Sequence, residues 1–304
     1  MSQLPTPTDP QASEGIRDLA RRRPITVLLA VLLGPVFIVY AAVLLTGLSF
    51  VVGQLAQIVL MIAAPTLVSA WAGGRPAVRR VVAGLLRWRF GALRWLLVLF
   101  ALPVISLSLA LATGTLGAPG GGWLHEGLSY ALFLVGGALT ANLWEETVWS
   151  SFVQGRLMTR HGLLAGSMLT AVPFGVIHLP LAFQNGLRAT TAKDAVTTWA
   201  FMIALAPFLR YLLGMLLVDT NGSTLAAGVL HASMNATMAM TVLSGGWHAL
   251  VALAVLTPAV AAYRIRCGRS AVHGFAPRLA LDTTDRPSEP LPVRDVRAID
   301  LQEL

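Results

Sequence analysis

The sequence predicts an all-α membrane protein, a polytopic bundle of about eight transmembrane helices with a polar site near mid-membrane. Two observations carry this prediction. Hydrophobic residues make up 56% of the 304 residues and charged residues only 12%, whereas a soluble domain carries about 25% charged residues. The apolar residues also gather in repeated runs of about 20, the length that crosses a bilayer as a helix.

The chain begins with a polar segment, residues 1–24, that is rich in Pro, Ser and Arg. This composition predicts a mobile segment, which we place in the cytoplasm. The first apolar run begins at Ile25, directly after three arginines and a proline. It is too long to be the core of a cleavable signal peptide, so we expect it to be retained as the first membrane span.

Eight apolar segments follow one another with short loops, which predicts a single transmembrane domain over residues 25–266. The segments cover residues 25–47, 51–72, 94–115, 127–150, 163–184, 197–217, 223–243 and 247–264. Beyond them, residues 267–304 contain many Pro, Asp and Arg residues and no apolar period. We predict that this tail is disordered and cytoplasmic.

The arginines predict how the chain is oriented in the membrane. They gather on one side of the predicted spans, at Arg17, Arg21, Arg22, Arg23, Arg75, Arg79, Arg80, Arg87, Arg89, Arg156, Arg160, Arg264, Arg266 and Arg269. The loops on the opposite side hold only Arg188 and Lys193, or no basic residue. The positive-inside rule then predicts a multi-pass protein of the cell membrane with both termini cytoplasmic. Because these arginines flank apolar spans, we attribute the net charge of +8 to membrane orientation and predict no nucleic-acid partner.

Two adjacent glutamates, Glu145 and Glu146, lie in a segment that otherwise predicts a membrane-buried helix. Residues 25–262 contain only three other acidic residues, and these fall at segment ends or in loops: Glu126, Asp194 and Asp219. Ionisable groups at membrane depth are costly and usually face a functional interior. The glutamate pair is therefore the strongest chemical signal in the chain.

Two other predicted helices carry polar residues at helical spacing. His178 follows Phe174 by four residues, and Asn235 follows His231 by four, so each pair shares one helix face. Taken singly, an intramembrane histidine is as often a hydrogen-bonded packing residue, Asn235 alone favours a role in joining helices, and Glu145 alone is consistent with an ion pair to an arginine. Four polar groups at matching depth on three helices favour a shared site instead.

This set of side chains suits hydrolysis of an amide. A carboxylate beside an imidazole can deprotonate a water and later protonate the leaving amine, and a His–Asn pair can donate hydrogen bonds to an oxyanion. Alternatively, Glu145, His178 and His231 are an adequate ligand set for a catalytic zinc ion. Buried Glu and His also serve proton-coupled transport, so a transporter remains a further alternative, although we find no internal repeats of the kind that transporters show.

At these residues the chain resembles the CAAX-protease and bacteriocin-processing family of intramembrane proteases, and in particular its type II CAAX prenyl endopeptidases. The family's three motifs occur in order as Glu145-Glu146-Thr-Val-Trp-Ser150, Phe174-Gly-Val-Ile-His178 and His231-Ala-Ser-Met-Asn235. The resemblance covers roughly residues 75–245. It implies an intramembrane endopeptidase that acts on a membrane-bound peptide or protein substrate and is surrounded by membrane lipids.

The resemblance also implies a role for each motif residue. Glu145 would be the principal base that activates water, with Glu146 as a supporting residue and Phe174 beside the site. His178 would assist Glu145 or share a metal with it. His231 and Asn235 would polarise the scissile carbonyl, or His231 would ligate the metal. These residues do not decide between a zinc and a metal-free glutamate mechanism.

One position departs from the family pattern, because Ser150 stands where the first motif has an arginine. An arginine four residues after Glu146 would face it on the helix and hold it ionised. Arg210, in the sixth apolar run, would supply this charge from another helix or would instead snorkel to the membrane interface. Arg156, further along the same helix, is another candidate. If neither does so, the protein would be an impaired enzyme, a catalytically silent scaffold or an immunity-type protein.

The predicted depths of the motif residues in the membrane determine how long the fourth helix must be. Glu145 is expected toward the cytoplasmic side of the membrane and His178 toward the outer side. They meet only if the fourth helix extends to about Leu157. We therefore predict a long fourth helix, with the site open to the cytoplasmic half of the membrane.

Overall fold

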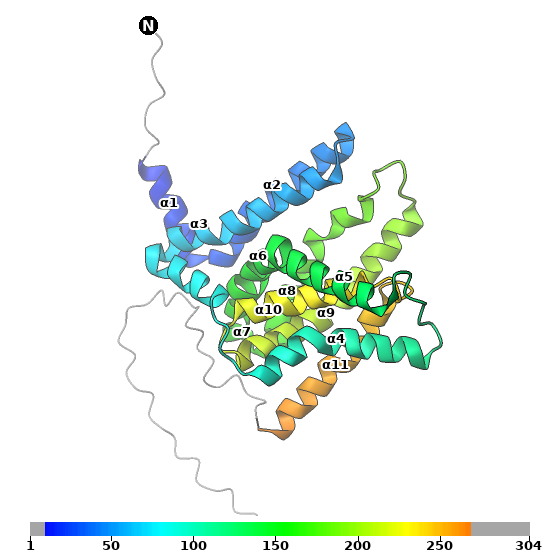
Figure 1. The fold of residues 1–304 in the computed structure, drawn as a ribbon. Coiled ribbons are helices and arrows are strands. Elements are labelled where there is room, and N and C mark those ends of the chain that lie inside the picture. Colours follow the sequence, from blue (N-terminus) through cyan, green and yellow to red (C-terminus); the bar gives the residue numbers. More distant parts are fainter. Residues whose placement is uncertain (1–9, 269–304) are drawn as a thin grey trace, which may run out of the picture.

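The computed structural model describes residues 10–268, which form the helical bundle of Figure 1. The α-helices are α1 (Pro10–Arg22), α2 (Pro24–Thr46), α3 (Phe50–Leu85), α4 (Ala92–Ala112), α5 (Gly122–Gly137), α6 (Leu143–Glu146), α7 (Gly155–His161), α8 (Leu163–Ile177), α9 (Ala192–Asp219), α10 (Thr224–Met238) and α11 (Trp247–Arg266). Two π-helical segments, η1 (Ala138–Asn142) and η2 (Thr147–Gln154), and one 3-10 segment, η3 (Leu179–Phe183), complete them. No β-strand occurs within residues 10–268, so the predicted all-α class is confirmed.

Seven helices in this part of the chain are long and apolar enough to cross a membrane. They are Pro24–Thr46, Phe50–Leu85, Ala92–Ala112, Gly122–His161, Leu163–Phe183, Ala192–Asp219 and Trp247–Arg266. Their outer faces expose large apolar side chains such as Leu45, Leu124 and Leu132. Apolar surface of this kind is expected where a helix faces lipid.

The segment predicted as the seventh of eight spans, residues 223–243, forms only a 15-residue helix, α10. A helix needs about 20 residues to cross the hydrocarbon core. The apolar run looked longer because the loop after α10 is buried as well: Met240, Val242 and Leu243 pack with Ala110 of α4. Seven helices rather than eight therefore meet the length of a span.

Helix α10 nevertheless carries the chain from one end of the bundle to the other, through the middle of the helices in Figure 1. At its start, Ser223 donates a hydrogen bond to the carbonyl oxygen of Arg87, before α4 (2.5 Å). Beyond its end, the carbonyl oxygen of Val242 accepts a hydrogen bond from the amide of Gly117, shortly after α4 (2.8 Å). Because these contacts lie at opposite ends of α4, α10 counts as a crossing of the protein.

The predicted long fourth helix is confirmed. It runs without interruption over Gly122–His161, 40 residues, through α5, η1, α6, η2 and α7. The chain then turns at Gly162, whose φ of +81° favours glycine, and returns as α8. A Cβ atom at Gly166 would lie 2.5 Å from the Met158 amide nitrogen, so the return helix packs directly against the backbone of α7.

The N-terminal segment differs from its prediction. Residues 1–24 were expected to be mobile, but Pro10–Arg22 form helix α1, which packs on α2 and α3. Ala20 is fully buried there, and Asp18 forms an ion pair with Arg22 one turn later. Helical spacing of apolar residues among the arginines explains this helix. Residues 1–9 and the predicted tail beyond residue 268 lie outside the described residues.

Candidate active site

The two glutamates lie on α6, a four-residue α-helical stretch between the π-helical segments η1 and η2. A π-helical turn shifts the register of the side chains that follow it, and such turns are frequent at functional sites. Here the neighbouring carboxylates of Glu145 and Glu146 point to different surroundings. The helical pattern of the sequence does not reveal this irregularity.

Glu146 is fully buried and forms a bidentate ion pair with Arg210 of α9. Arg210 Nη1 donates to Oε2 (2.9 Å) and Nη2 to Oε1 (2.5 Å), the strongest geometry available to such a pair. The side chain of Arg210 has no exposed surface, so it does not snorkel. The prediction that Arg210 replaces the missing motif arginine requires an ion pair between Arg210 and Glu146, and this ion pair supports it.

Two more groups complete the surroundings of Glu146. Ser150, the residue that stands in the place of the arginine, donates its hydroxyl proton to Oε2. His231 lies with Nδ1 2.8 Å from Oε1, and because a carboxylate accepts, the imidazole is the donor. Arg156, the alternative cation, instead donates to the carbonyl oxygen of Phe152 (2.7 Å) and covers the ring of that residue.

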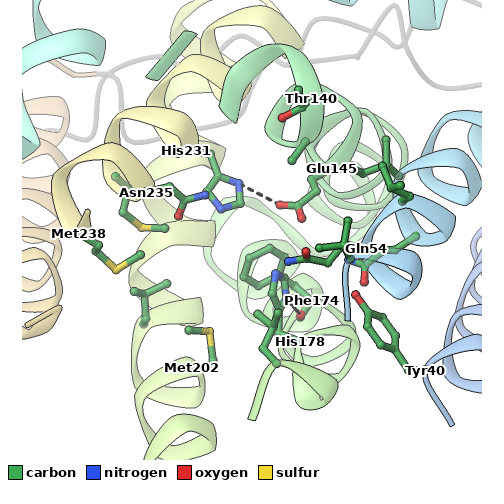
Figure 2. Close-up of a pocket in the computed structure, with 18 residues that line it drawn as sticks. Tyr40, Gln54, Thr140, Glu145, Phe174, His178, Met202, His231, Asn235 and Met238 are labelled. Atoms are coloured by element: carbon green, nitrogen blue, oxygen red, sulfur yellow. Dashed lines mark hydrogen bonds and ion pairs between the residues drawn. The ribbon is translucent and has the colours of Figure 1, made fainter. Parts of the chain in front are cut away.

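Glu145 faces a cavity rather than an arginine. Its side chain is 12% exposed, and its Oε2 lies 3.6 Å from Nδ1 of His231, the contact dashed in Figure 2. The cavity has a volume of about 490 Å³. It is lined by predicted residues, namely Glu145, Phe174, His178, His231 and Asn235, and by others that include Tyr40, Gln54, Gln57, Thr140, Met202 and Met238. The three motifs thus meet at one cavity. Glu146 is fully buried and does not line it.

The ring of Phe174 lies between His178, which lines the cavity, and the buried guanidinium of Arg210. Its ring centroid is 4.4 Å from that of His178, and the Arg210 guanidinium carbon lies 4.2 Å from the same ring. His178 Nδ1 is 2.6 Å from the Phe174 carbonyl oxygen. That oxygen only accepts, so Nδ1 carries the proton and Nε2 of the neutral ring is an acceptor. The spacing of four residues between Phe174 and His178 therefore sets the tautomer of the histidine.

The three predicted zinc ligands are Glu145, His178 and His231, which all line the cavity. Within residues 10–268, no three His, Cys, Asp or Glu side chains gather as ligands of one ion. In His178 Nδ1 is bound to a carbonyl oxygen and in His231 to a carboxylate, an arrangement that is usual for histidines whose Nε2 binds a metal. Zinc ligation by these three residues stays a prediction, and no step below depends on it.

Gly228 of α10 sets the distance between the histidine and the glutamates. A Cβ atom at this position would lie 2.6 Å from Cδ2 and 3.0 Å from Cα of Leu143, the first residue of α6. Only glycine lets α10 approach α6 this closely, one turn before His231.

We expect Gly228→Ala to push α10 away from α6. Overpacking of this kind lowers the free energy of unfolding by about 1–3 kcal/mol, and a shift of about 1 Å in the groups of a site slows a reaction there roughly 100-fold. Initial rates and thermal unfolding of the purified variant measure both effects. Gly127→Ala is the matched control, because a Cβ atom there meets nothing within 4 Å. An unchanged rate in Gly228→Ala would show that close approach of the two helices is not required.

Four polar residues of the cavity were not predicted: Tyr40 of α2, Gln54 and Gln57 of α3, and Thr140 of η1, whose hydroxyl donates to the Gly136 carbonyl oxygen. A signal for the glutamines was present, since they are two amides three residues apart in an otherwise apolar run. The tyrosine carries no such signal, because an aromatic residue near the end of a span is ordinary.

Comparison with known proteins agrees with the motifs. The family model for type II CAAX prenyl endopeptidase Rce1-like proteins matches residues 127–237. No curated protein matches the chain significantly. The matched segment runs from α5 to α10 and contains all three motifs, whereas α2, α3 and α11 lie outside it. Over residues 127–237 the chain is therefore similar to type II CAAX prenyl endopeptidase Rce1-like proteins, as the motifs around Glu145, His178 and His231 predict.

Proposed function

We propose that the protein is an intramembrane endopeptidase that hydrolyses a peptide bond of a membrane-associated substrate with a glutamate-activated water. The observation that carries the proposal is the unequal placement of the two glutamates. Glu146 is held by Arg210 and Ser150, whereas Glu145 faces the cavity beside His231. Glu145 is therefore the carboxylate that has both access to water and room for a substrate.

The reaction would proceed in two steps. Glu145 takes a proton from water, and the resulting hydroxide attacks the carbonyl carbon of the scissile bond. The oxygen of the tetrahedral intermediate accepts hydrogen bonds from the Asn235 amide and, when His231 is protonated, from its Nε2–H. As the carbon–nitrogen bond breaks, Glu145 returns its proton to the leaving amine.

The remaining residues would orient these groups. Glu146 accepts Nδ1–H of His231 and so holds the ring toward the cavity. Nε2 of His178 is free to accept a hydrogen bond from the attacking water, since Nδ1 donates to the Phe174 carbonyl. Arg210 holds Glu146 charged, which is the task of the arginine that Ser150 replaces.

The alternative of a catalytically silent scaffold or immunity-type protein rested on Ser150. The Arg210–Glu146 pair weakens it, because the charge that Ser150 removes is supplied from α9. We also propose the cell membrane as the location, with both termini cytoplasmic and membrane lipids around the bundle, on the strength of the arginine distribution.

The proposal is tested with the purified full chain in lipid vesicles. Two probes are offered, a farnesylated peptide that ends in a CAAX sequence and an unprenylated transmembrane peptide, and products are identified by mass spectrometry. We expect cleavage of at least one probe and none in protein-free vesicles. Intact peptides in both cases would contradict an endopeptidase. Metal analysis of the active protein tests the zinc prediction, since about one zinc per chain would favour it.

A further inference from the structure

The cavity has a second polar wall, built from helices outside the family match. Tyr40 of α2 and Gln54 and Gln57 of α3 line it, and Figure 2 shows Tyr40 and Gln54 on the far side of the cavity from His231 and Asn235. None of the three takes part in the steps proposed above. Their side chains are neutral, and between them they offer both hydrogen-bond donors and acceptors.

The two glutamines are unusual residues for an apolar membrane span. Between Phe50 and Pro65 they are the only polar side chains; Gln54 is exposed and Gln57 half-buried. Neither amide makes a hydrogen bond to another residue of the described part of the chain. An unpaired amide in an apolar setting costs free energy, so both amides are available to a ligand that enters the cavity.

The phenol beside them is held rigidly. Tyr40 is 2% exposed, and its ring centroid lies 5.0 Å from that of Phe50. A Cβ atom at Gly53 would lie 2.5 Å from Tyr40 Cε1, so glycine next to Gln54 makes the space that the ring fills. This packing fixes the Tyr40 hydroxyl at the cavity wall next to the glutamines.

We infer that Gln54 and Gln57 bind the main chain of an extended substrate segment across the cavity from Glu145, with the Tyr40 hydroxyl as a third contact. The inference rests on the proposed function. A carboxamide both donates and accepts, and so complements peptide N–H and C=O groups. Side chains at i and i+3 stand about 5–6 Å apart, close to the roughly 6.6 Å between alternate residues of an extended chain.

The same argument defines the class of substrate. The main-chain groups of an intact transmembrane helix are satisfied within the helix, which leaves nothing for the glutamines to bind. An unwound or C-terminal extended segment has unpaired N–H and C=O groups that need partners inside the membrane. The glutamine wall therefore selects an extended peptide rather than a helix.

The experiment measures binding separately from cleavage. Dissociation constants of the farnesylated CAAX peptide and of the unprenylated transmembrane peptide are determined with full-length protein carrying Glu145→Gln, which prevents turnover. Adding Gln54→Leu and Gln57→Leu is expected to raise the dissociation constant of the bound peptide about tenfold, the loss of one or two net hydrogen bonds. Thermal unfolding should stay unchanged, since leucine suits an apolar span. Gln184→Leu is the matched control, because Gln184 is exposed and does not line the cavity.

The outcomes separate the inference from the function on which it rests. Equal dissociation constants with and without the two leucines, in a protein whose wild type cleaves the peptide, would overturn the glutamine assignment alone. Failure of the wild type to bind either peptide would overturn the proposed function together with the inference. A tenfold loss confined to the Gln54 and Gln57 variants supports the inference.

Discussion

Replacing Arg210 with leucine is expected to lower the free energy of unfolding by about 3–5 kcal/mol, the cost of breaking a buried ion pair from one side. The carboxylate of Glu146 is fully buried and pairs with no second arginine within residues 10–268, because Arg156 turns to Phe152. Without its partner it must be protonated or drawn out of its site. Either change removes the acceptor that orients His231, so cleavage should fall with stability. Thermal unfolding and initial rates of Arg210→Leu measure the two effects.

Second substitutions test whether loss of the positive charge of Arg210 causes the losses of stability and cleavage. Adding Ser150→Arg to Arg210→Leu returns a cation to the helix that carries Glu146, four residues away, and should recover part of both losses. Glu146→Gln with Arg210→Leu removes both charges and should be more stable than either single variant. Arg156→Leu is the control for loss of a buried arginine without a carboxylate partner. If Arg210→Leu unfolds and cleaves as the wild type does, Glu146 does not depend on this pair.

Glu145→Gln is expected to reduce the cleavage rate by about 10²–10⁴-fold, the usual contribution of a positioned general base. The amide keeps the shape of the side chain but cannot take the proton from water. Stability should change by less than about 0.5 kcal/mol, because Glu145 lies at the cavity surface and is not paired with an arginine. Initial rates with the cleaved peptide and thermal unfolding provide the two readings.

Glu146→Gln is the matched comparison, since it makes the same chemical change one residue away. It leaves the guanidinium of Arg210 buried without its anion, so it should lose stability, whereas Glu145→Gln should lose only activity. A Glu145→Gln protein that folds normally and retains its rate would refute the assignment of the base. Equal loss of stability in both variants would refute the division of roles between the two glutamates.

Much of this protein could be predicted from its amino-acid sequence. Apolar runs of span length predict the helices and the all-α class because a bilayer forces the backbone to satisfy its hydrogen bonds within each segment. Spacing of four residues predicts that Phe174 faces the same way as His178, and His231 the same way as Asn235. The long fourth helix followed from the need to bring Glu145 near His178. These are local properties, or properties of a single helix, and a sequence encodes them directly.

Other features depended on contacts between distant residues. Whether Arg210 meets Glu146, 64 residues away, or turns to the membrane interface depends on how α9 packs against the fourth helix. The π-helical segments on either side of the two glutamates also have no signal in the helical pattern of the sequence. The short length of α10 could not be predicted from the sequence, because the buried loop after it is as apolar as a membrane span. The glutamate pair marks the site in the sequence, but three-dimensional packing separates the carboxylate that faces the cavity from the one that supports it, since burial and pairing are properties of the assembled helices.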